Sequence, residues 1–186
     1  MAAAKKVKVK VKETAVKKTA VKTSKIAEAA LPSAILKVGD QIPDFTLSSD
    51  AHGQVALRDF IGKKNVVLYF YPKDNTPGCT KEACAFQAEE PKFKKLNTVI
   101  IGVSPDSVKS HENFRKKYGL DFVLVSDDGH KLAEACGIWV LKQMYGRSYM
   151  GVQRATFLFN KKGIATHIWN KVSIEGHAAD VLGQLS

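Results

Sequence analysis

One uninterrupted run of apolar and aromatic residues, Val66 to Tyr71, limits the fold of this chain more than any other segment. Its β-branched and aromatic side chains favour a strand, and a strand without polar positions must be buried on both faces. Such strands occur where helices cover both faces of a sheet. The sequence therefore predicts an α/β protein with this strand at the centre of its sheet.

Strand-like and helix-like segments alternate after this central run. Strands that are separated by helices pair in parallel through crossover connections. The expected elements are a short strand at 44–47 followed by a turn at 50–53, helices over 78–96 and 107–118, and strands over 98–103 and 122–125.

The C-terminal part follows a different pattern. Residues 155–159 and 164–169 are strand-like and flank a turn at 160–163, which predicts an antiparallel hairpin. A last helix is expected from about residue 174. The chain is therefore expected to fold as a mixed β-sheet flanked by helices on both faces.

The first 34 residues differ in composition from the rest of the chain. They contain no aromatic residue and carry nine lysines against Glu13 and Glu28, which accounts for +7 of the net charge of +11. Such a segment cannot bury enough apolar surface to offset the entropy lost on ordering. We expect a disordered Lys-rich arm over residues 1–34 and one folded domain over residues 35–186.

The lysines of this arm allow two functions. They could hold the protein loosely to DNA or another polyanion, since clustered lysines gain affinity by releasing counterions. They could also form only a solvated tail that aids solubility, and the lack of arginines and aromatic residues to read bases favours this alternative. An organelle transit peptide is disfavoured, because the arm has no arginine and little serine.

Cys79 lies where the buried strand gives way to a helix. Pro77 and Gly78 break regular structure just before it, so the helix is expected to begin close to the cysteine. The unpaired N–H groups and the positive dipole end of a helix start stabilise a thiolate. Reactive groups gather at the carboxyl ends of strands in such sheets, which makes Cys79 the candidate nucleophile.

The stretch PKDNTPGCTKEAC resembles the active-site loop of peroxiredoxins. The family pattern PxxxTxxC is matched by Pro72, Thr76 and Cys79, and Glu82 matches a glutamate that often follows three residues later. The wider string YFYPKDNTPGCTKEAC is similar to the bacterioferritin-comigratory-protein or peroxiredoxin Q subfamily. In that subfamily the resolving cysteine lies five residues after the peroxidatic one, and Cys84 holds this position. The resemblance implies a thioredoxin-like fold for the domain.

The resemblance also implies a role for each matched residue. The sulfur of Cys79 attacks the hydroperoxide, Thr76 hydrogen-bonds the peroxide, and Pro72 shields the sulfur from water. Glu82 orients arginine side chains, and Arg154, in the segment GVQRATFLF, pairs with the sulfur. Without the resemblance, Arg154 would be assigned to the surface, and Glu82 would be a first-turn residue favoured by the helix dipole.

The implied activity is that of a thiol-dependent antioxidant peroxidase without a cofactor. It reduces hydrogen peroxide and organic hydroperoxides through a sulfenic acid on Cys79, and thioredoxin or a similar dithiol recycles the disulfide between Cys79 and Cys84. On a regular helix, Cα atoms five residues apart are about 8.6 Å from each other. A disulfide tolerates at most about 7 Å, so oxidation must unwind the start of the helix.

The rate at which this helix opens bears on the cycle. Pro91 lacks a donor N–H and is expected to end or bend the helix in its middle, which would ease opening. Slow opening would let a second peroxide reach the sulfenic acid, so sensitivity to overoxidation would follow.

The remaining cysteine and the histidines carry no predicted chemistry. Cys136 has apolar neighbours and no cation close to it in the sequence, so we expect a buried, inert thiol. The five histidines show neither metal-type pairing with cysteine nor close spacing, and no metal site is expected. They are His52, His111, His130, His167 and His177.

Two other functions stay open on the sequence alone. A thioredoxin-like disulfide oxidoreductase would share the fold, but that chemistry typically uses Cys-x-x-Cys, whereas four residues separate Cys79 from Cys84. A nucleic-acid-tethered protein would act mainly through its basic arm.

The sequence also predicts a location and an assembly state. It has no apolar run long enough to span a membrane and no apolar core of a secretory signal at its start, which favours a cytoplasmic protein. The arm also allows a nuclear or nucleoid-associated location. The cysteine pair within one chain permits a monomer, because catalysis then needs no partner subunit.

Overall fold

The computed structural model describes residues 35–51, 53–144 and 146–185. The predicted arm over residues 1–34 lies outside these residues, and so does His52. The disorder of the arm and both of its functional interpretations therefore stay predictions.

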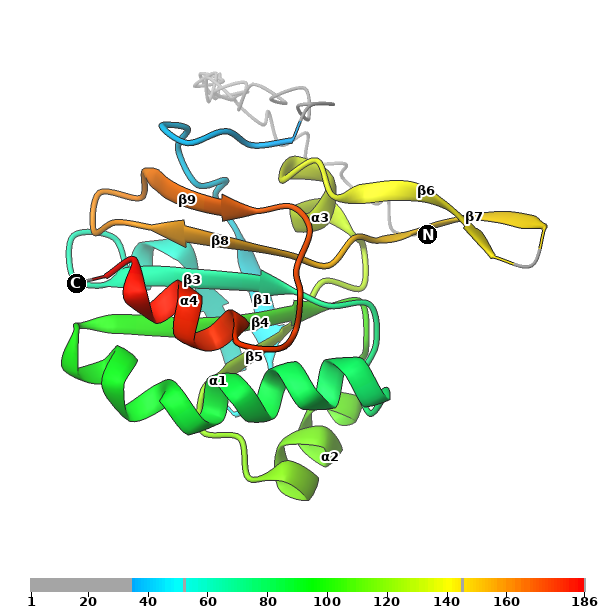
Figure 1. Cartoon of the computed structure of the whole chain (residues 1–186), viewed down its shortest axis with the longest axis horizontal. Helices are drawn as coiled ribbons and strands as arrows, with labels where there is room; N and C mark the ends of the chain where they lie inside the picture. The colour runs from blue at the N-terminus through cyan, green and yellow to red at the C-terminus, as the bar shows by residue number, and fades with distance from the viewer. Residues whose placement is uncertain (1–34, 52, 145, 186) are drawn as a thin grey trace, which may run out of the picture. The chain divides into compact units, whose positions relative to one another are not determined.

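A seven-stranded mixed sheet, in the order β2-β1-β5-β4-β3-β8-β9, forms the centre of the described domain (Figure 1). The predicted central strand is β3, Asn65–Phe70, and its residues from Val66 to Phe70 are completely buried. β3 pairs in parallel with β4, Thr98–Ser104, and antiparallel with β8, Ala155–Phe159. β4 in turn pairs in parallel with β5, Val123–Ser126. These pairings confirm the parallel core that the alternating pattern predicts.

Antiparallel pairs complete the two edges of the sheet. The predicted hairpin consists of β8 and β9, Ala165–Trp169. At the other edge, β1, Thr46–Ser49, pairs with β2, Gly53–Ala56, and with β5. β1 begins two residues after the expected start of this strand, because its register with β2 begins at Thr46 opposite Ala56.

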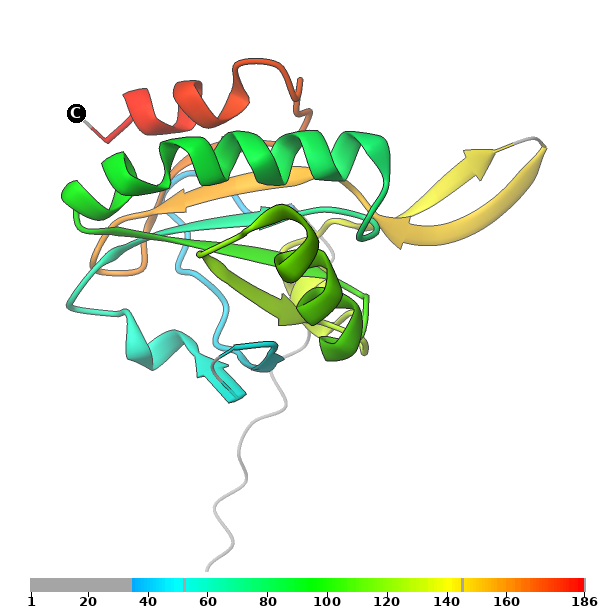
Figure 2. The same ribbon diagram turned by 90° about the horizontal axis from the view of Figure 1, so that it is seen from below.

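Helices cover both faces of the sheet (Figure 2). One face packs against three helices: α1 (Pro77–Lys95), α2 (Val108–Tyr118) and α4 (His177–Gly183). They contact it through Phe86, Phe114 and Val181, respectively. The other face packs against α3, Lys131–Ala135, and the short 3-10 helix η1, Leu57–Asp59. Successive β3 side chains point to opposite faces, so each of the two apolar clusters receives alternate residues of this strand. This arrangement is the predicted fold class.

α1 continues through Pro91 to Lys95, so the helix does not end at this proline as one of the two expectations had it, and the helix predicted over 78–96 is confirmed to within one residue at each end. Phe86 and Phe93, on either side of the proline, are both completely buried against the sheet. Burial of these two aromatic side chains outweighs the one backbone hydrogen bond that proline removes.

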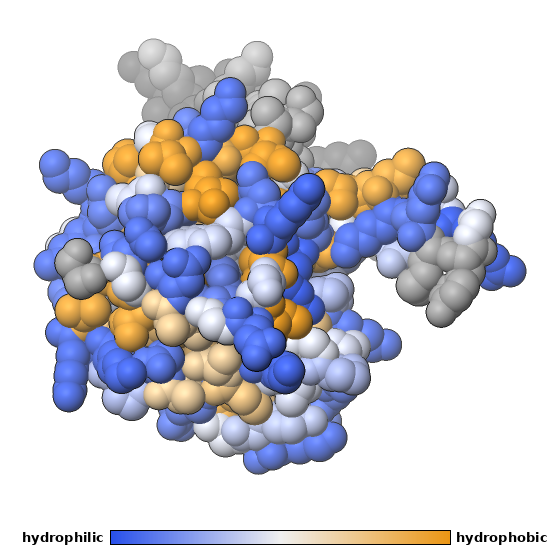
Figure 3. All heavy atoms as spheres, in the orientation of Figure 1, coloured by the Kyte–Doolittle hydropathy of each residue, from blue (hydrophilic) through white to orange (hydrophobic). Residues whose placement is uncertain are grey.

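The start of the last helix and one hairpin also differ from the sequence-based expectation. α4 begins at His177 instead of residue 174, because Gly176 before it has a left-handed backbone with φ of 75°. The hairpin of β6, Trp139–Met144, and β7, Arg147–Val152, lies outside the main sheet and was not predicted. Its exposed positions mix apolar and polar residues, so it lacks the clean alternation of a half-buried strand (Figure 3).

Candidate active site

Cys79 is the third residue of α1 and is only 1% exposed. Thr76 is the N-cap, and Pro77 occupies the first position, where a backbone N–H would have no partner in the helix. The N–H of Thr80 donates to the carbonyl of Thr76 at 2.9 Å and so closes the first turn. The helix therefore begins where the sequence predicts, with the sulfur at its positive dipole end.

Arg154 lies directly before β8 and contacts the sulfur of Cys79. Its Nη2 donates to Sγ at 3.1 Å, while its Nη1 forms an ion pair with a carboxylate oxygen of Glu82. The pairing of β3 with β8 brings these groups together, because Phe70 at the end of β3 lies opposite Ala155. Arg154 is therefore part of a buried cluster and not a surface residue.

The charges of this cluster depend on one another. Burial raises the pKa of Glu82 to about 7, although the neighbouring Arg154 opposes the shift. Burial acts against the charge of Arg154, but Glu82 and Cys79 outweigh it and hold the arginine pKa above its usual value. The guanidinium therefore stays charged at neutral pH, whereas the carboxyl of Glu82 gains or loses its proton near pH 7.

Thr76 and Pro72 lie on the loop that leads to the helix. The hydroxyl of Thr76 donates to the carbonyl of Lys73 at 3.1 Å, so its oxygen keeps lone pairs free to accept a hydrogen bond. Pro72 lies two residues after the end of β3 and is exposed. The burial of Cys79 comes from an apolar cluster that includes Tyr69 and Tyr71, so the shielding role of Pro72 stays a prediction.

Cys84 is exposed, whereas Cys79 is buried, although both lie on α1. Both are free thiols in this structure, and so is Cys136. Cys136 is completely buried, and burial raises the pKa of its thiol well above the usual value. Cys136 therefore stays a protonated, inaccessible thiol, as the sequence predicts.

Three residues near the sulfur were missed by sequence reasoning. The hydroxyl of Tyr69 is buried without a hydrogen-bond partner in the described part of the chain, and its pKa is raised by burial and then by Glu82. Lys142 on β6 donates to the carbonyl of Val152 at 2.7 Å, and its pKa is lowered by burial and then by Arg154. Ile174 lies so close to Gly78 that a side-chain carbon added there would meet its Cδ1 at 3.2 Å. No local motif marks these residues, because strand pairing and loop packing bring them to the site.

The described residues contain no group of three or more His, Cys, Asp or Glu side chains that could hold a metal ion. Two of the histidines are completely or almost completely buried and form hydrogen bonds. His111 Nδ1 lies 2.9 Å from Asp74, and His177 Nε2 lies 2.8 Å from the hydroxyl of Thr156.

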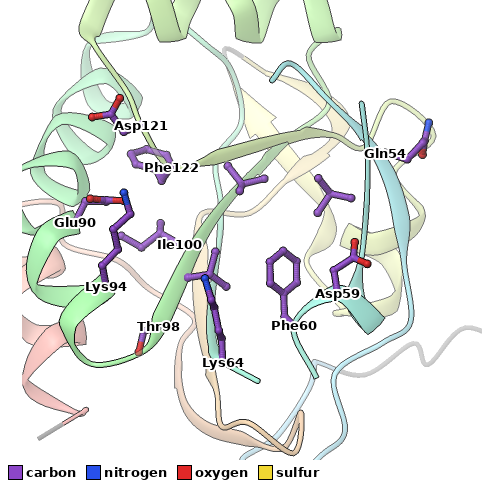
Figure 4. Close-up of a pocket in the computed structure, with 13 residues that line it drawn as sticks. Gln54, Asp59, Phe60, Lys64, Glu90, Lys94, Thr98, Ile100, Asp121 and Phe122 are labelled. Carbon is purple, nitrogen blue, oxygen red and sulfur yellow. The ribbon is translucent and has the colours of Figure 1, made fainter. Parts of the chain in front are cut away.

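A cavity of about 430 Å³ opens at the opposite end of the parallel strands (Figure 4). Phe60, Ile100 and Phe122 line it together with charged side chains that include Lys64 and Asp121. It lies where β4 and β5 begin, whereas Cys79 follows the end of β3. The cavity is therefore separate from the cysteine site.

The model of the AhpC/TSA family matches residues 38–168 of this chain. Peroxiredoxin Bcp of Bacillus subtilis is 48% identical over 150 residues, which are 81% of this chain and 95% of the relative. The chloroplastic peroxiredoxin Q of Oryza sativa subsp. japonica is 40% identical over 166 residues, covering 84% of this chain and 74% of the relative.

Solved structures show the same similarity. Peroxiredoxin Q of Xanthomonas campestris is 44% identical with a TM-score of 0.74, covering 83% of this chain and 97% of that one. A bacterioferritin comigratory protein of the same organism, described for its alkyl peroxide reduction activity, is 43% identical with a TM-score of 0.74. That alignment covers 82% of this chain and 96% of the other.

Proposed function

Because the chain belongs to the AhpC/TSA family and is a thiol peroxidase like its Bcp and peroxiredoxin Q relatives, we propose a catalytic cycle run by two cysteines of one helix. Cys79 is the peroxidatic residue and Cys84 the resolving one. The observation that carries this proposal is the 3.1 Å contact of Arg154 with the buried sulfur of Cys79 in the first turn of α1. A permanent positive charge there stabilises the negative charge on the sulfur and on the reacting oxygen during the attack.

In the first step, the thiolate of Cys79 attacks the terminal oxygen of a hydroperoxide ROOH. The O–O bond breaks, the sulfur is oxidised to a sulfenic acid, and the departing alkoxide takes up a proton and leaves as ROH. Arg154 stabilises the sulfur and the reacting oxygen, while the oxygen of Thr76 accepts the O–H of the peroxide. Pro72 limits the access of water to this loop, and Glu82 keeps Arg154 in place.

In the second step, the thiol of Cys84 attacks the sulfenic sulfur of Cys79. A disulfide forms and water leaves. Both cysteines lie on the regular part of α1, where positions five residues apart are too far from each other for a disulfide. The start of α1 therefore unwinds between the two steps.

An external dithiol protein such as thioredoxin then reduces the bridge and takes up its two oxidising equivalents through a mixed disulfide. The exposure of Cys84 supports this step, because a partner thiol can reach its sulfur. Hydrogen peroxide and organic hydroperoxides are the proposed substrates. The alkyl peroxide reduction described for the Xanthomonas campestris relative supports the second class. The biological role is antioxidant defence and redox homeostasis.

The enzyme acts in the cytoplasm as a monomer. No helix in the described part of the chain is long and apolar enough to cross a membrane. The lysine arm adds at most weak contacts to DNA or another polyanion, with nucleoid or nuclear association as their consequence.

Stoichiometric hydrogen peroxide, added to the reduced wild type and to Cys84→Ser, tests the cycle. We expect fast peroxide loss in both proteins. Peptide masses should show a bridge between Cys79 and Cys84 in the wild type and a trapped sulfenic acid on Cys79 in the variant. Cys136→Ser serves as the control and should behave like the wild type, because this thiol is buried and protonated.

An unreactive Cys79, or a bridge through Cys136, would contradict the assignment of the site. Rapid reduction of insulin disulfides with slow peroxide consumption would favour the disulfide oxidoreductase instead.

A further inference from the structure

The loop between β3 and α1, which we call the cysteine loop, is attached to a buried polar cluster. The cluster is centred on Asp74, which is 4% exposed. Its Oδ1 accepts a hydrogen bond from the hydroxyl of Tyr71 at 2.8 Å. Its Oδ2 accepts one from the hydroxyl of Ser110 at 2.7 Å and lies 2.9 Å from Nδ1 of His111. We call these four residues the Asp74 node.

The node joins the cysteine loop to α2. Asp74 belongs to the loop between β3 and α1, whereas Ser110 and His111 lie in the first turns of α2. The backbone N–H of Asp74 also donates to Asp106 at 2.7 Å, in the connection between β4 and α2. The loop is therefore attached through both its side chain and its backbone to elements other than α1.

The next residue, Asn75, has a left-handed backbone with φ of 57°. Asparagine adopts this conformation more readily than most residues other than glycine, so the turn suits this residue. The reversal at Asn75 leads directly into Thr76, the N-cap of α1. The hydrogen bonds of Asp74 therefore hold the loop at a point two residues before Thr76 and five residues before Cys79.

The node is also held together electrostatically. His111 is completely buried, and its hydrogen bond to Asp74, together with those of Ser110 and Tyr71, lowers the pKa of this carboxyl against the effect of burial. A buried carboxylate that accepts three hydrogen bonds is strongly oriented, since each bond to a charged group stabilises its geometry. Within the described residues, His111 Nε2 has no hydrogen-bond partner, so His111 is attached to the network through Nδ1.

We propose that Asp74 is a positioning residue for peroxide reduction, which acts through the loop by fixing the hydroxyl of Thr76 relative to the sulfur of Cys79. The node also stays closed while α1 unwinds, because its partners are Tyr71, directly after β3, and two residues of α2. The unwinding therefore begins after Thr76. The cysteine loop keeps its conformation throughout and can bind peroxide again as soon as the helix re-forms. This inference rests on the proposed peroxidase cycle.

Asp74→Asn tests the proposal, because it keeps the shape but replaces one acceptor oxygen with a donor. Single-turnover oxidation of Cys79 by hydrogen peroxide should slow by about tenfold to a hundredfold, the effect of losing hydrogen bonds to a charged group. Alkylation of Cys79 by iodoacetamide should stay nearly unchanged, because it needs the thiolate but not the oriented Thr76. A purely structural role would not separate these two rates.

Asp127→Asn is the matched control. Asp127 is another buried aspartate, 3% exposed, and its carboxylate accepts the backbone N–H groups of Leu132 and Ala133 at the start of α3. It should lose stability but keep the wild-type rate of peroxide oxidation. If Asp74→Asn does not fold, Ser110→Ala and its exposed neighbour Lys109→Ala form a second pair, of which only the first should slow oxidation.

Wild-type peroxide rates in Asp74→Asn or in Ser110→Ala, or an equal loss in Asp127→Asn, would overturn the inference. A wild type that does not consume peroxide would instead overturn the proposed function, so the two failures can be told apart.

Discussion

At the scale of single residues, Glu82 is the group whose charge decides how firmly Arg154 is held at the sulfur. It is 1% exposed, and burial raises its pKa to about 7. The folded protein therefore binds this proton more tightly than the unfolded chain does. Between about pH 4.5 and about 7 the unfolded chain loses this proton while the folded protein keeps it, so the free energy of unfolding falls as the pH rises. Ionisation in the folded protein near pH 7 then forms the ion pair with Arg154.

We expect the rate of Cys79 oxidation in the wild type to fall as the pH is lowered through about 7, where Glu82 becomes protonated. A neutral carboxyl still accepts a hydrogen bond from Arg154 but no longer attracts its charge, so the guanidinium leaves the sulfur more easily. Glu82→Gln should have the low rate at every pH and lack this step. Stopped-flow oxidation at a series of pH values measures the effect.

Glu112→Gln provides the comparison, because Glu112 is a surface carboxylate on α2 paired with Lys109. The rate of Cys79 oxidation in Glu112→Gln should depend on pH as it does in the wild type. A step near pH 7 that persists in Glu82→Gln would show that another group controls the rate.

At the scale of elements, the proposed cycle gives α1 two opposing tasks. Its first turn holds Cys79 beside Arg154, yet in this cycle the same turn must open before Cys84 can reach a sulfenic acid on Cys79. The second half is anchored differently, because Phe86 and Phe93 are completely buried against the sheet. Opening is therefore confined to the part of the helix before Phe86.

We expect hydrogen exchange to show this division. In the disulfide form, amides from Thr80 to Cys84 should lose protection relative to the reduced form, whereas those between Phe86 and Phe93 should keep it. The physical reason is that only the first segment must unwind to bring the two sulfurs within bonding distance. Exchange followed by mass spectrometry on reduced and oxidised protein measures the difference.

Cys84→Ser treated with peroxide is the control, because its sulfenic acid has no partner and no bridge forces the helix open. Equal protection of the first segment in the reduced and the disulfide form would contradict the unwinding step.

At the scale of the whole molecule, charge and catalysis separate along the chain. Residues 1–34 account for +7 of the net charge of +11, whereas the residues with proposed catalytic roles all lie between 72 and 154. The interactions of the arm with polyanions should depend strongly on salt, since they arise from counterion release. The chemistry of the site should not depend on the arm.

Deletion of residues 1–34 is therefore expected to leave peroxide turnover and the melting temperature unchanged. It should abolish retention on heparin at low salt, which the full chain should show. Turnover with thioredoxin and elution from a heparin column check both expectations. Loss of peroxidase activity on deletion would favour a protein that acts mainly through its arm.

The sequence by itself determined the fold class and the central strand, and it singled out Cys79 as the candidate reactive cysteine. These follow from local signals: the apolar run that becomes β3, and the Pro–Gly break that starts α1 at Cys79. The match to a known motif also indicated Thr76, Glu82, Cys84 and Arg154. Local patterns are sufficient here because hydrophobic periodicity and helix-start chemistry act over a few residues.

Only the tertiary structure decided which distant groups surround the sulfur. The ion pair of Arg154 with Glu82 and the Asp74 node depend on strand pairing and on the packing of α2, which join residues far apart in the chain. Packing also overrode a local signal at Pro91, where burial of Phe93 keeps α1 intact. A side chain's charge and orientation depend on all its neighbours in space, and the sequence lists only its neighbours along the chain.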